Sequence, residues 1–238
     1  MAIPVSQIFL QLKPGASITD FPVYVEGSDR FRNKTTKYTL FNDKKADALM
    51  KKYPEFYDMW KNVKYAIMKV DILRFVILYH YGGIVADLDV FPLKPLASVI
   101  PDKDKLVVWR PARSFNYEVI YTPKHNSLCL DFIRYVKTQI EEKSKMKIYE
   151  TWRARFVLQT TGPASFKRFL DKYHKGDENV LYEEMGTILN VDDYSRLKSR
   201  LKELPFITLQ QTGWLDSVGR TETNTKKVKR REELLDLL

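Results

Sequence analysis

The stretch GGIVADLDVFP, residues 82–92, constrains the fold more than any other part of the chain. Two glycines precede a hydrophobic run, and within that run Asp87 and Asp89 stand one residue apart. In a β-strand, residues i and i+2 point to the same side. The sequence therefore predicts a strand that directs both carboxylates into one polar space, while Ala86 and Leu88 pack on the other side.

Two neighbouring carboxylates repel each other unless a positive group offsets their charge. A divalent cation is the natural candidate, because carboxylate oxygens suit Mg²⁺ and Mn²⁺. Ligands of open α/β sheets bind at the carboxyl ends of the strands, which is where this pair is expected. The alternative is that both acids are solvated at a strand end or paired with lysine side chains.

The segment before the glycines, residues 64–81, is predicted to be a helix. Its apolar residues at 66, 67, 70, 73, 77 and 78 recur at helical spacing, and glycine at 82 favours the end of a helix. Asp71 and Arg74 are spaced i, i+3 and share a face of this helix. Asp71 is suited to accept hydrogen bonds from sugar hydroxyls, and Arg74 to donate to a phosphate or sugar oxygen. A plain intrahelical ion pair is the alternative.

Strands and helices alternate along the rest of the chain, which predicts one α/β domain with a largely parallel sheet. Besides 84–90, strands are expected at 5–12, 22–27, 37–43, 106–110, 117–121, 179–184 and 205–211. Helices are expected at 46–53, 54–63, 126–143, 162–174 and 191–204.

The charge balance, 40 basic against 30 acidic residues, gives a net charge of +10. Such a surface attracts nucleic acid, anionic membrane or phosphorylated small molecules. Part of the excess lies in KKVKRR, residues 226–231, which is typical of a solvated tail. No segment has the length and hydrophobicity of a membrane span, and no signal peptide opens the chain. We therefore expect a soluble, cytoplasmic protein of bacterial or viral type, or a piece of a longer chain, for which peripheral membrane contact stays open.

The segment 64–96 resembles the core of the DXD-containing glycosyltransferases of family 32, the group of mannosyltransferases and capsular-polysaccharide enzymes. A related pattern occurs in the large clostridial glucosylating toxins. The shared pattern is Asp-x-x-Arg, Gly-Gly, an apolar pair, Asp-x-Asp and proline. It falls here on Asp71, Arg74, Gly82, Gly83, Asp87, Asp89 and Pro92. Fainter similarity covers residues 3–11, 117–126 and 160–166.

This resemblance implies a GT-A-type nucleotide-sugar-binding fold over residues 1–219, followed by a basic, flexible or helical tail over 220–238. It implies transfer of a sugar, with retention, from a nucleotide diphosphate to a glycan, polysaccharide or glycoprotein acceptor. We expect a UDP-sugar such as UDP-glucose as donor before a GDP-sugar, and Mn²⁺ or Mg²⁺ as cofactor.

The resemblance also assigns roles to individual residues. Asp71, Arg74, Asp87 and Asp89 would be catalytic. The metal would be held by Asp87 and Asp89, with Thr212 in place of the serine of the toxins' acid-x-x-Ser-x-Trp segment, whose acid is replaced here by Leu209. The donor would be bound by Phe9, Gln11, Asp71, Arg74, Gly82, Gly83, Asp87 and Trp214.

Three other functions compete with this interpretation. A catalytically inactive module would bind a nucleotide sugar without turnover. A basic nucleic-acid-binding protein would bind regardless of Asp87 and Asp89, but no helix-turn-helix, zinc or RNP signature supports it. A metal-dependent nuclease or phosphotransferase commonly needs more acids or histidines than this one pair supplies.

Overall fold

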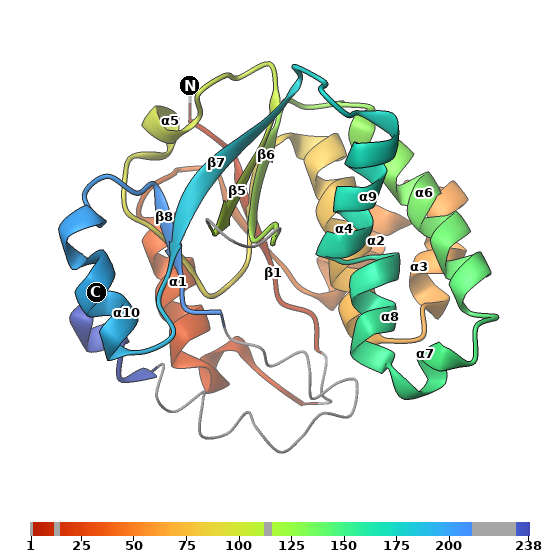
Figure 1. The fold of residues 1–238 in the computed structure, drawn as a ribbon, viewed down its shortest axis with the longest axis horizontal. Helices are drawn as coiled ribbons and strands as arrows, with labels where there is room; N and C mark the ends of the chain where they lie inside the picture. Colours follow the sequence, from red (N-terminus) through yellow and green to blue (C-terminus); the bar gives the residue numbers. More distant parts are fainter. Residues whose placement is uncertain (1, 12–14, 112–115, 211–231) are drawn as a thin grey trace.

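The computed structural model describes residues 2–11, 15–111, 116–210 and 232–238, which form one curled sheet of eight strands with helices around it (Figure 1). The order across the sheet is β2-β1-β3-β6-β5-β7-β8-β4. The strands are β1 (Val5–Ile8), β2 (Tyr38–Phe41), β3 (Gly83–Ala86), β4 (Val90–Pro92), β5 (Leu106–Pro111), β6 (Val119–Thr122), β7 (Val180–Thr187) and β8 (Phe206–Thr208).

Ten α-helices are assigned within the described residues, and most of the longer ones form a layer on one side of the sheet, whereas α1 lies near β8 (Figure 1). They are α1 (Pro22–Arg32), α2 (Asp43–Met50), α3 (Pro54–Asn62), α4 (Ala66–Tyr81), α5 (Leu96–Val99), α6 (Leu128–Lys143), α7 (Ile148–Thr151), α8 (Arg153–Thr160), α9 (Pro163–Tyr173) and α10 (Val191–Leu197). None of the helices in the described part of the chain combines the length and hydrophobicity that crossing a membrane requires.

The predicted α/β class is confirmed. Strand β1 pairs in parallel with β2 and β3, and β7 pairs in parallel with β5 and β8. Strand β6 runs antiparallel to β3 and β5, as β4 does to β8. Parallel pairings thus outnumber antiparallel ones by four to three among the described strands, so the sheet is mixed.

The strand predicted at 22–27 is wrong, because these residues begin helix α1. Val23, Gly27 and Phe31 are buried and stand four residues apart, so they occupy one face of the helix. Pro22 occupies the first turn, where its missing N–H costs nothing. Val23 and Val25 alternate as in a strand, but they do not form a common buried face, since Val25 is only half-buried.

The strand predicted over 84–90 is interrupted at the acids. Strand β3 ends at Ala86, a turn follows in which the Val90 amide donates to the Asp87 carbonyl at 3.3 Å, and β4 starts at Val90. Strand β3 pairs with β1 and β6, whereas β4 pairs with β8 at the end of the strand order. The acids therefore lie in a connection between two parts of the sheet, and strand alternation does not set their directions.

Helix α4 is confirmed, and it is buried all round rather than along one stripe. Every residue from Asp71 to Leu78 is buried, because α4 lies between the sheet and helices α2, α3 and α6. It ends at Gly82, which has a φ of +65°. Gly83 has a φ of +82°, and a side chain there would overlap the Pro4 carbonyl oxygen.

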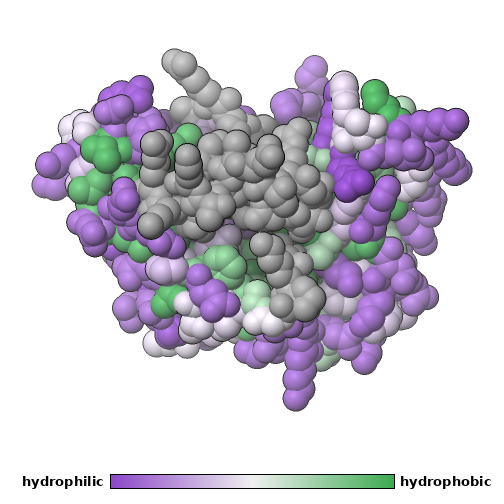
Figure 2. Space-filling view, turned by 90° about the horizontal axis from the view of Figure 1, so that it is seen from below, coloured by the Kyte–Doolittle hydropathy of each residue, from purple (hydrophilic) through white to green (hydrophobic). Residues whose placement is uncertain are grey.

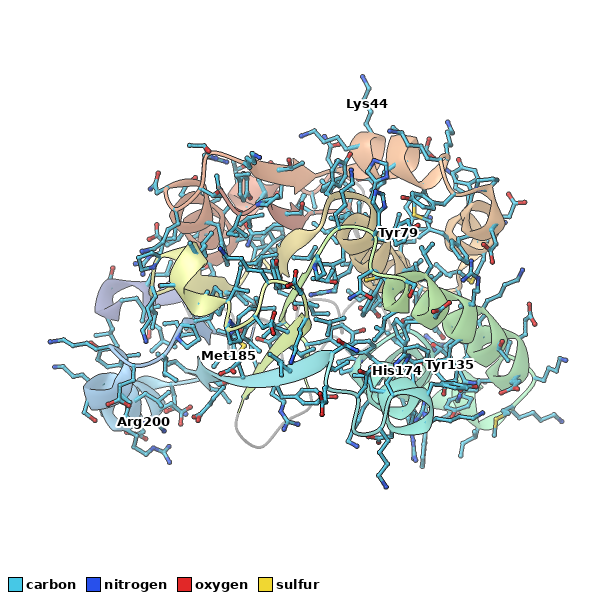
Figure 3. The ribbon with its side chains drawn as sticks, turned by 90° about the horizontal axis from the view of Figure 1, so that it is seen from above. Lys44, Tyr79, Tyr135, His174, Met185 and Arg200 are labelled. Atoms are coloured by element: carbon cyan, nitrogen blue, oxygen red, sulfur yellow. The ribbon has the colours of Figure 1, made fainter. Side chains whose placement is uncertain are left out.

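Aromatic rings fill the space between α4 and its neighbours. The Phe75 ring centre lies 4.5 Å from that of Phe132 in α6 and 4.9 Å from that of Phe166 in α9. Seen from above, Tyr135 of α6 and His174, which follows α9, lie near each other beyond the start of β7 (Figure 3). The Phe169 ring contacts both. These contacts fix α4, and with it Asp71 and Arg74, against the sheet.

The last described residues pack on the domain. Leu234 is buried in a cluster with Ile188, Ile207 and Leu209, so residues 232–238 cover the outer part of β8. The predicted boundary at 219–220 lies outside the described residues and stays a prediction.

Candidate active site

The two aspartates lie beyond the carboxyl end of β3. Figure 2 views the molecule from below, which is the side toward which β1 runs in Figure 1. Hydrophilic side chains cover most of the periphery of this face, and several hydrophobic ones lie nearer its middle. Asp89 is buried, whereas the Asp87 side chain is 36% exposed. One acid is thus held inside the fold and the other is accessible to a ligand.

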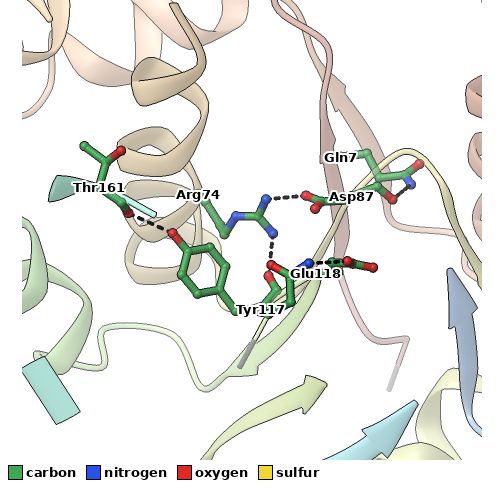
Figure 4. A network of polar contacts seen from close by, with 7 residues as sticks. Gln7, Arg74, Asp87, Tyr117, Glu118 and Thr161 are labelled. Carbon is green, nitrogen blue, oxygen red and sulfur yellow. Dashed lines mark hydrogen bonds and ion pairs between the residues drawn. The ribbon is translucent and has the colours of Figure 1, made fainter. Parts of the chain in front are cut away.

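Arg74 connects helix α4 to this turn (Figure 4). Its guanidinium is buried and donates from Nη2 to Asp87 Oδ1 and from Nη1 to the Tyr117 carbonyl at 3.0 Å. The same guanidinium lies 5.2 Å from the centre of the Tyr117 ring. The ion pair of Arg74 therefore joins the two halves of the motif, in place of the intrahelical pair that was the alternative.

Thr161, the residue that follows helix α8, holds Asp71 in place. The Thr161 hydroxyl donates to Asp71 Oδ2 at 2.7 Å, and the Thr161 carbonyl accepts from the Tyr117 hydroxyl at 2.7 Å. Burial raises the pKa of Asp71 to about 6, although the Thr161 hydrogen bond and the Arg74 charge oppose this rise. Asp71, Arg74, Tyr117 and Thr161 thus form one polar network inside an apolar layer.

The backbone of the turn is fixed by the first strands. Gln7 of β1 donates from Nε2 to the Asp87 carbonyl at 2.9 Å, and its Oε1 accepts from the Tyr38 hydroxyl of β2 at 2.8 Å. Helix α1 contacts the turn at Gly27, where a side chain would overlap the Leu88 carbonyl oxygen. Only glycine allows this approach.

Glu118 belongs to the site, although sequence reasoning missed it. The Asp87 amide donates to the Glu118 carbonyl at 2.8 Å, in continuation of the β3–β6 pairing, so the two residues lie side by side. Glu118 is buried, its Oε1 accepts from Gln210 at 3.1 Å, and its Oε2 has no hydrogen-bond partner among the described residues. The available signal was an acid inside the apolar run YEVIY, 117–121.

Negative charge is concentrated around Glu118. Burial raises the pKa of Glu118 to about 8, and the negative charges of Asp89 and Asp87 add to this rise. Side-chain hydrogen bonds from Thr208 and Gln210 oppose it. A bound cation would relieve the repulsion among the three carboxyl groups.

The residues of the site fit a divalent cation. Carboxylates are preferred ligands of Mg²⁺ and Mn²⁺, and Mg²⁺ is commonly held by one or two carboxylates together with substrate phosphates. In the part of the chain that the structure describes, no group of three or more acidic, histidine or cysteine side chains forms a metal site of its own. Asp87 and Asp89 are the residues that would hold such a cation.

The other predicted site residues that the structure describes make no hydrogen bond of their own with Asp71, Arg74 or Asp87. Phe9 is half-buried, and its ring centre lies 6.2 Å from that of Phe21. Gln11 is exposed, and its backbone N–H donates to the Asp43 carboxylate. Gly82 and Gly83 lie at the start of β3, whereas Asp87 follows its end, so the glycines serve the helix-to-strand turn. Thr212 and Trp214 lie outside the described residues.

Comparison with known proteins identifies the same segment. Residues 23–106 match the family described as glycosyltransferase sugar-binding region containing DXD motif. The chain is 46% identical over 54 residues to mannosyl phosphorylinositol ceramide synthase SUR1 of Saccharomyces cerevisiae, covering 22% of this chain and 14% of that protein. It is 33% identical over 97 residues to inositol phosphoceramide mannosyltransferase 1 of Schizosaccharomyces pombe, covering 37% and 28%. The chain thus spans well under a third of the length of these relatives.

Similarity to solved structures extends over the whole chain at low identity. A structure titled PaToxG glycosyltransferase has a TM-score of 0.47 and 13% identity, covering 98% of this chain and 86% of that one. A glycosyltransferase involved in glycosylation of the major capsid of PBCV-1 has a TM-score of 0.45 and 9% identity, covering 96% and 99%.

Proposed function

We propose that this protein transfers a sugar from a nucleotide diphosphate to a hydroxyl acceptor, because residues 23–106 match the family described as glycosyltransferase sugar-binding region containing DXD motif. The observation that carries the proposal is the contact of Arg74 with Asp87. It brings the Asp-x-x-Arg helix and the Asp-x-Asp turn into one site with a buried and an accessible acid.

The reaction breaks the bond between the anomeric carbon and a diphosphate oxygen and forms a bond from that carbon to the acceptor oxygen. The acceptor hydroxyl loses its proton, and the nucleotide diphosphate leaves with the bonding electrons. A divalent cation held by Asp87 and Asp89 would supply Lewis-acid stabilisation of the leaving diphosphate.

The chain's own residues orient the donor and fix the acids. Arg74 holds Asp87 in one direction and keeps a positive charge beside it. Asp71, held by Thr161, is suited to bind donor hydroxyls. Gln7 fixes the carbonyl of Asp87, so the turn keeps its shape without a ligand. A preformed site of this kind lowers the entropy cost of bringing donor and acceptor together.

We propose a UDP-sugar as the donor, Mn²⁺ or Mg²⁺ as the cation, and retention at the anomeric carbon, as the resemblance implies. GDP-mannose belongs among the tested donors, because two of the similar proteins are named for mannosyl transfer. The acceptor class proposed is a glycan, polysaccharide or glycoprotein. The cytoplasmic location expected from the sequence stays a prediction.

A thermal-shift panel of UDP- and GDP-sugars, each with and without Mn²⁺, tests the proposal. One donor should raise the melting temperature only when Mn²⁺ is present, because ligands stabilise the state that binds them. Asp89→Ala should abolish this shift, and Asp58→Ala, which removes an exposed acid from α3, should leave it intact.

Turnover separates the proposed enzyme from a binding module. Release of free nucleotide diphosphate from the stabilising donor should occur with the unaltered chain and not with Asp89→Ala. A shift without any release, to an acceptor or to water, would favour the inactive module. Equal stabilisation with and without Mn²⁺ would remove the role assigned to the acids.

A further inference from the structure

Three large apolar side chains are exposed at one corner of the helix layer. Met146 and Ile148 are each 49% exposed and Trp152 is 47% exposed, all within seven residues around α7. The other exposed large apolar residues of the described chain are spread over different elements: Tyr81, Leu158, Tyr173, Tyr182, Leu189, Val191 and Leu237. Only this corner, residues 145–155, gathers three of them in so short a segment.

Positive side chains are interspersed with these apolar groups in the sequence. Lys145, Lys147, Arg153 and Arg155 are exposed, and Glu150 is the one acid of the segment, so its formal charge is +3. The Arg155 guanidinium lies 4.8 Å from the centre of the Trp152 ring. The corner thus offers an aromatic ring, two flexible apolar side chains and four exposed positive side chains.

The exposed side chains are carried by a fixed backbone. Tyr149, between the exposed positions, is buried; its ring lies 5.5 Å from that of Phe156, and its hydroxyl donates to Gln159 at 2.6 Å. The Trp152 amide donates to the Ile148 carbonyl at 3.1 Å. Because Tyr149 anchors the corner, its neighbours cannot turn inward to bury their apolar surface.

A cavity lies beside residues that flank the corner in the sequence. It has a volume of about 310 Å³, and the apolar part of its lining comes from Met59, Val63, Met68, Ile140 and Phe156. Ser144 and Phe156, which also line it, stand next in sequence to Lys145 and Arg155.

We propose that residues 145–155 bind the surface of a membrane that contains anionic lipids. Tryptophan favours the headgroup level, aliphatic side chains enter the acyl boundary, and lysine and arginine attract anionic headgroups. Charge complementarity and apolar insertion are satisfied together by a lipid surface, whereas nucleic acid offers no apolar layer for Met146 and Ile148. Figure 1 places α7 near the lower edge of the molecule, the edge toward which β1 runs. This inference does not depend on the proposed function.

Co-sedimentation with lipid vesicles tests the proposal. The full chain should bind vesicles of phosphatidylcholine and phosphatidylserine, mixed at about three to one, at least tenfold more strongly than phosphatidylcholine alone. The combined change Met146→Ser, Ile148→Ser and Trp152→Ser should lower this binding at least tenfold. The matched control, Tyr173→Ser with Val191→Ser, removes apolar groups that are 54% and 60% exposed elsewhere and should leave binding unchanged.

A second readout distinguishes insertion from simple charge attraction. Brominated phosphatidylcholine in the anionic vesicles should quench the tryptophan fluorescence of the full chain, and Trp152→Phe should remove that quenching. Replacing the basic residues of 226–231 by serine tests the other source of positive charge. The proposal is overturned if the full chain does not bind vesicles, or if vesicle binding survives the triple change but is lost when the basic residues of 226–231 are replaced. It is also overturned if the triple change instead abolishes self-association or binding to a DNA duplex.

Discussion

Thr161 donates a hydrogen bond of 2.7 Å to the carboxylate of Asp71, although 90 residues separate the two in the sequence. Thr161 is fully buried, and its carbonyl accepts from the Tyr117 hydroxyl. The loop between α8 and α9 therefore holds Asp71, the first acid of the motif, through Thr161.

Replacing Thr161 by valine keeps the shape of the side chain and removes the donor to Asp71. Because a buried carboxyl group then loses its partner, the free energy of unfolding should fall by about 1–3 kcal/mol, as measured by urea denaturation. Thr161→Ser should restore most of it. Thr138→Val, at an exposed threonine of α6, should change it by less than about 0.5 kcal/mol. Equal effects of the two valine changes would contradict this role for Thr161.

The pKa of Asp71 makes stability depend on pH. Because burial raises this pKa from 3.8 to about 6, the folded state keeps the proton over a range where the unfolded state has lost it. The stabilisation that protonated Asp71 adds to the free energy of unfolding is therefore fully present below about pH 4. It is lost as pH rises through 6, a change of roughly 3 kcal/mol.

Denaturation of the unaltered chain and of Asp71→Asn between about pH 4 and pH 7 measures this contribution as a difference between two proteins. The unaltered chain should lose stability relative to Asp71→Asn as pH rises. Asp58→Asn, at an exposed acid, should show no such trend. A difference that stays constant with pH would show that Asp71 titrates normally.

Arg74 should not be replaceable by lysine. Arginine donates from two nitrogens at once, to Asp87 and to the Tyr117 carbonyl, and a single ammonium group cannot reproduce this planar fork. Arg74→Lys should lower kcat/KM for the donor at least tenfold, in a nucleotide-release assay, while the chain stays folded. Arg134→Lys, at the exposed pair with Glu55, should leave it unchanged. Retained activity in Arg74→Lys would mean that only charge matters at this position.

Much of the fold was predictable because its signals are local. Pro54 begins α3 and Gly82 ends α4, each as the sequence predicts. The Asn42 side chain caps α2, which therefore begins at Asp43 and not at residue 46. Helix α1 was not predictable by alternation, because Val23 and Val25 are spaced as in a strand. Only the packing of α1 against β4 shows that Val23 and Gly27, four residues apart, form the buried face of a helix.

The site was predictable in its motif and not in its surroundings. Asp71, Arg74, Asp87 and Asp89 carry a recognisable pattern within 19 residues. Glu118 enters through the register of β6 on β3, and Thr161 through the packing of α8 on its neighbours. Contacts between segments so far apart depend on strand order, which a single sequence does not reveal.

Gly27 should control the shape of the Asp-x-Asp turn from outside it. Alanine in a helix normally stabilises by about 0.5–1 kcal/mol relative to glycine, but a methyl group at Gly27 would overlap the Leu88 carbonyl. Gly27→Ala should therefore destabilise the chain and weaken the Mn²⁺-dependent thermal shift by the donor.

The control for Gly27→Ala is Gly176→Ala, at a glycine with a φ of +74° and open space around it. It should cost some stability through backbone strain and leave the donor shift intact. A stabilising effect of Gly27→Ala would show that the turn moves freely away from α1.

The most direct test of the account is the position of the cation in crystals grown with the donor sugar nucleotide and Mn²⁺. The account predicts an anomalous peak at the manganese edge within about 2.0–2.4 Å of a carboxylate oxygen of Asp87 or Asp89, in contact with the donor diphosphate. A bound donor with no peak beside these carboxylates, or with the peak at another place, would contradict it.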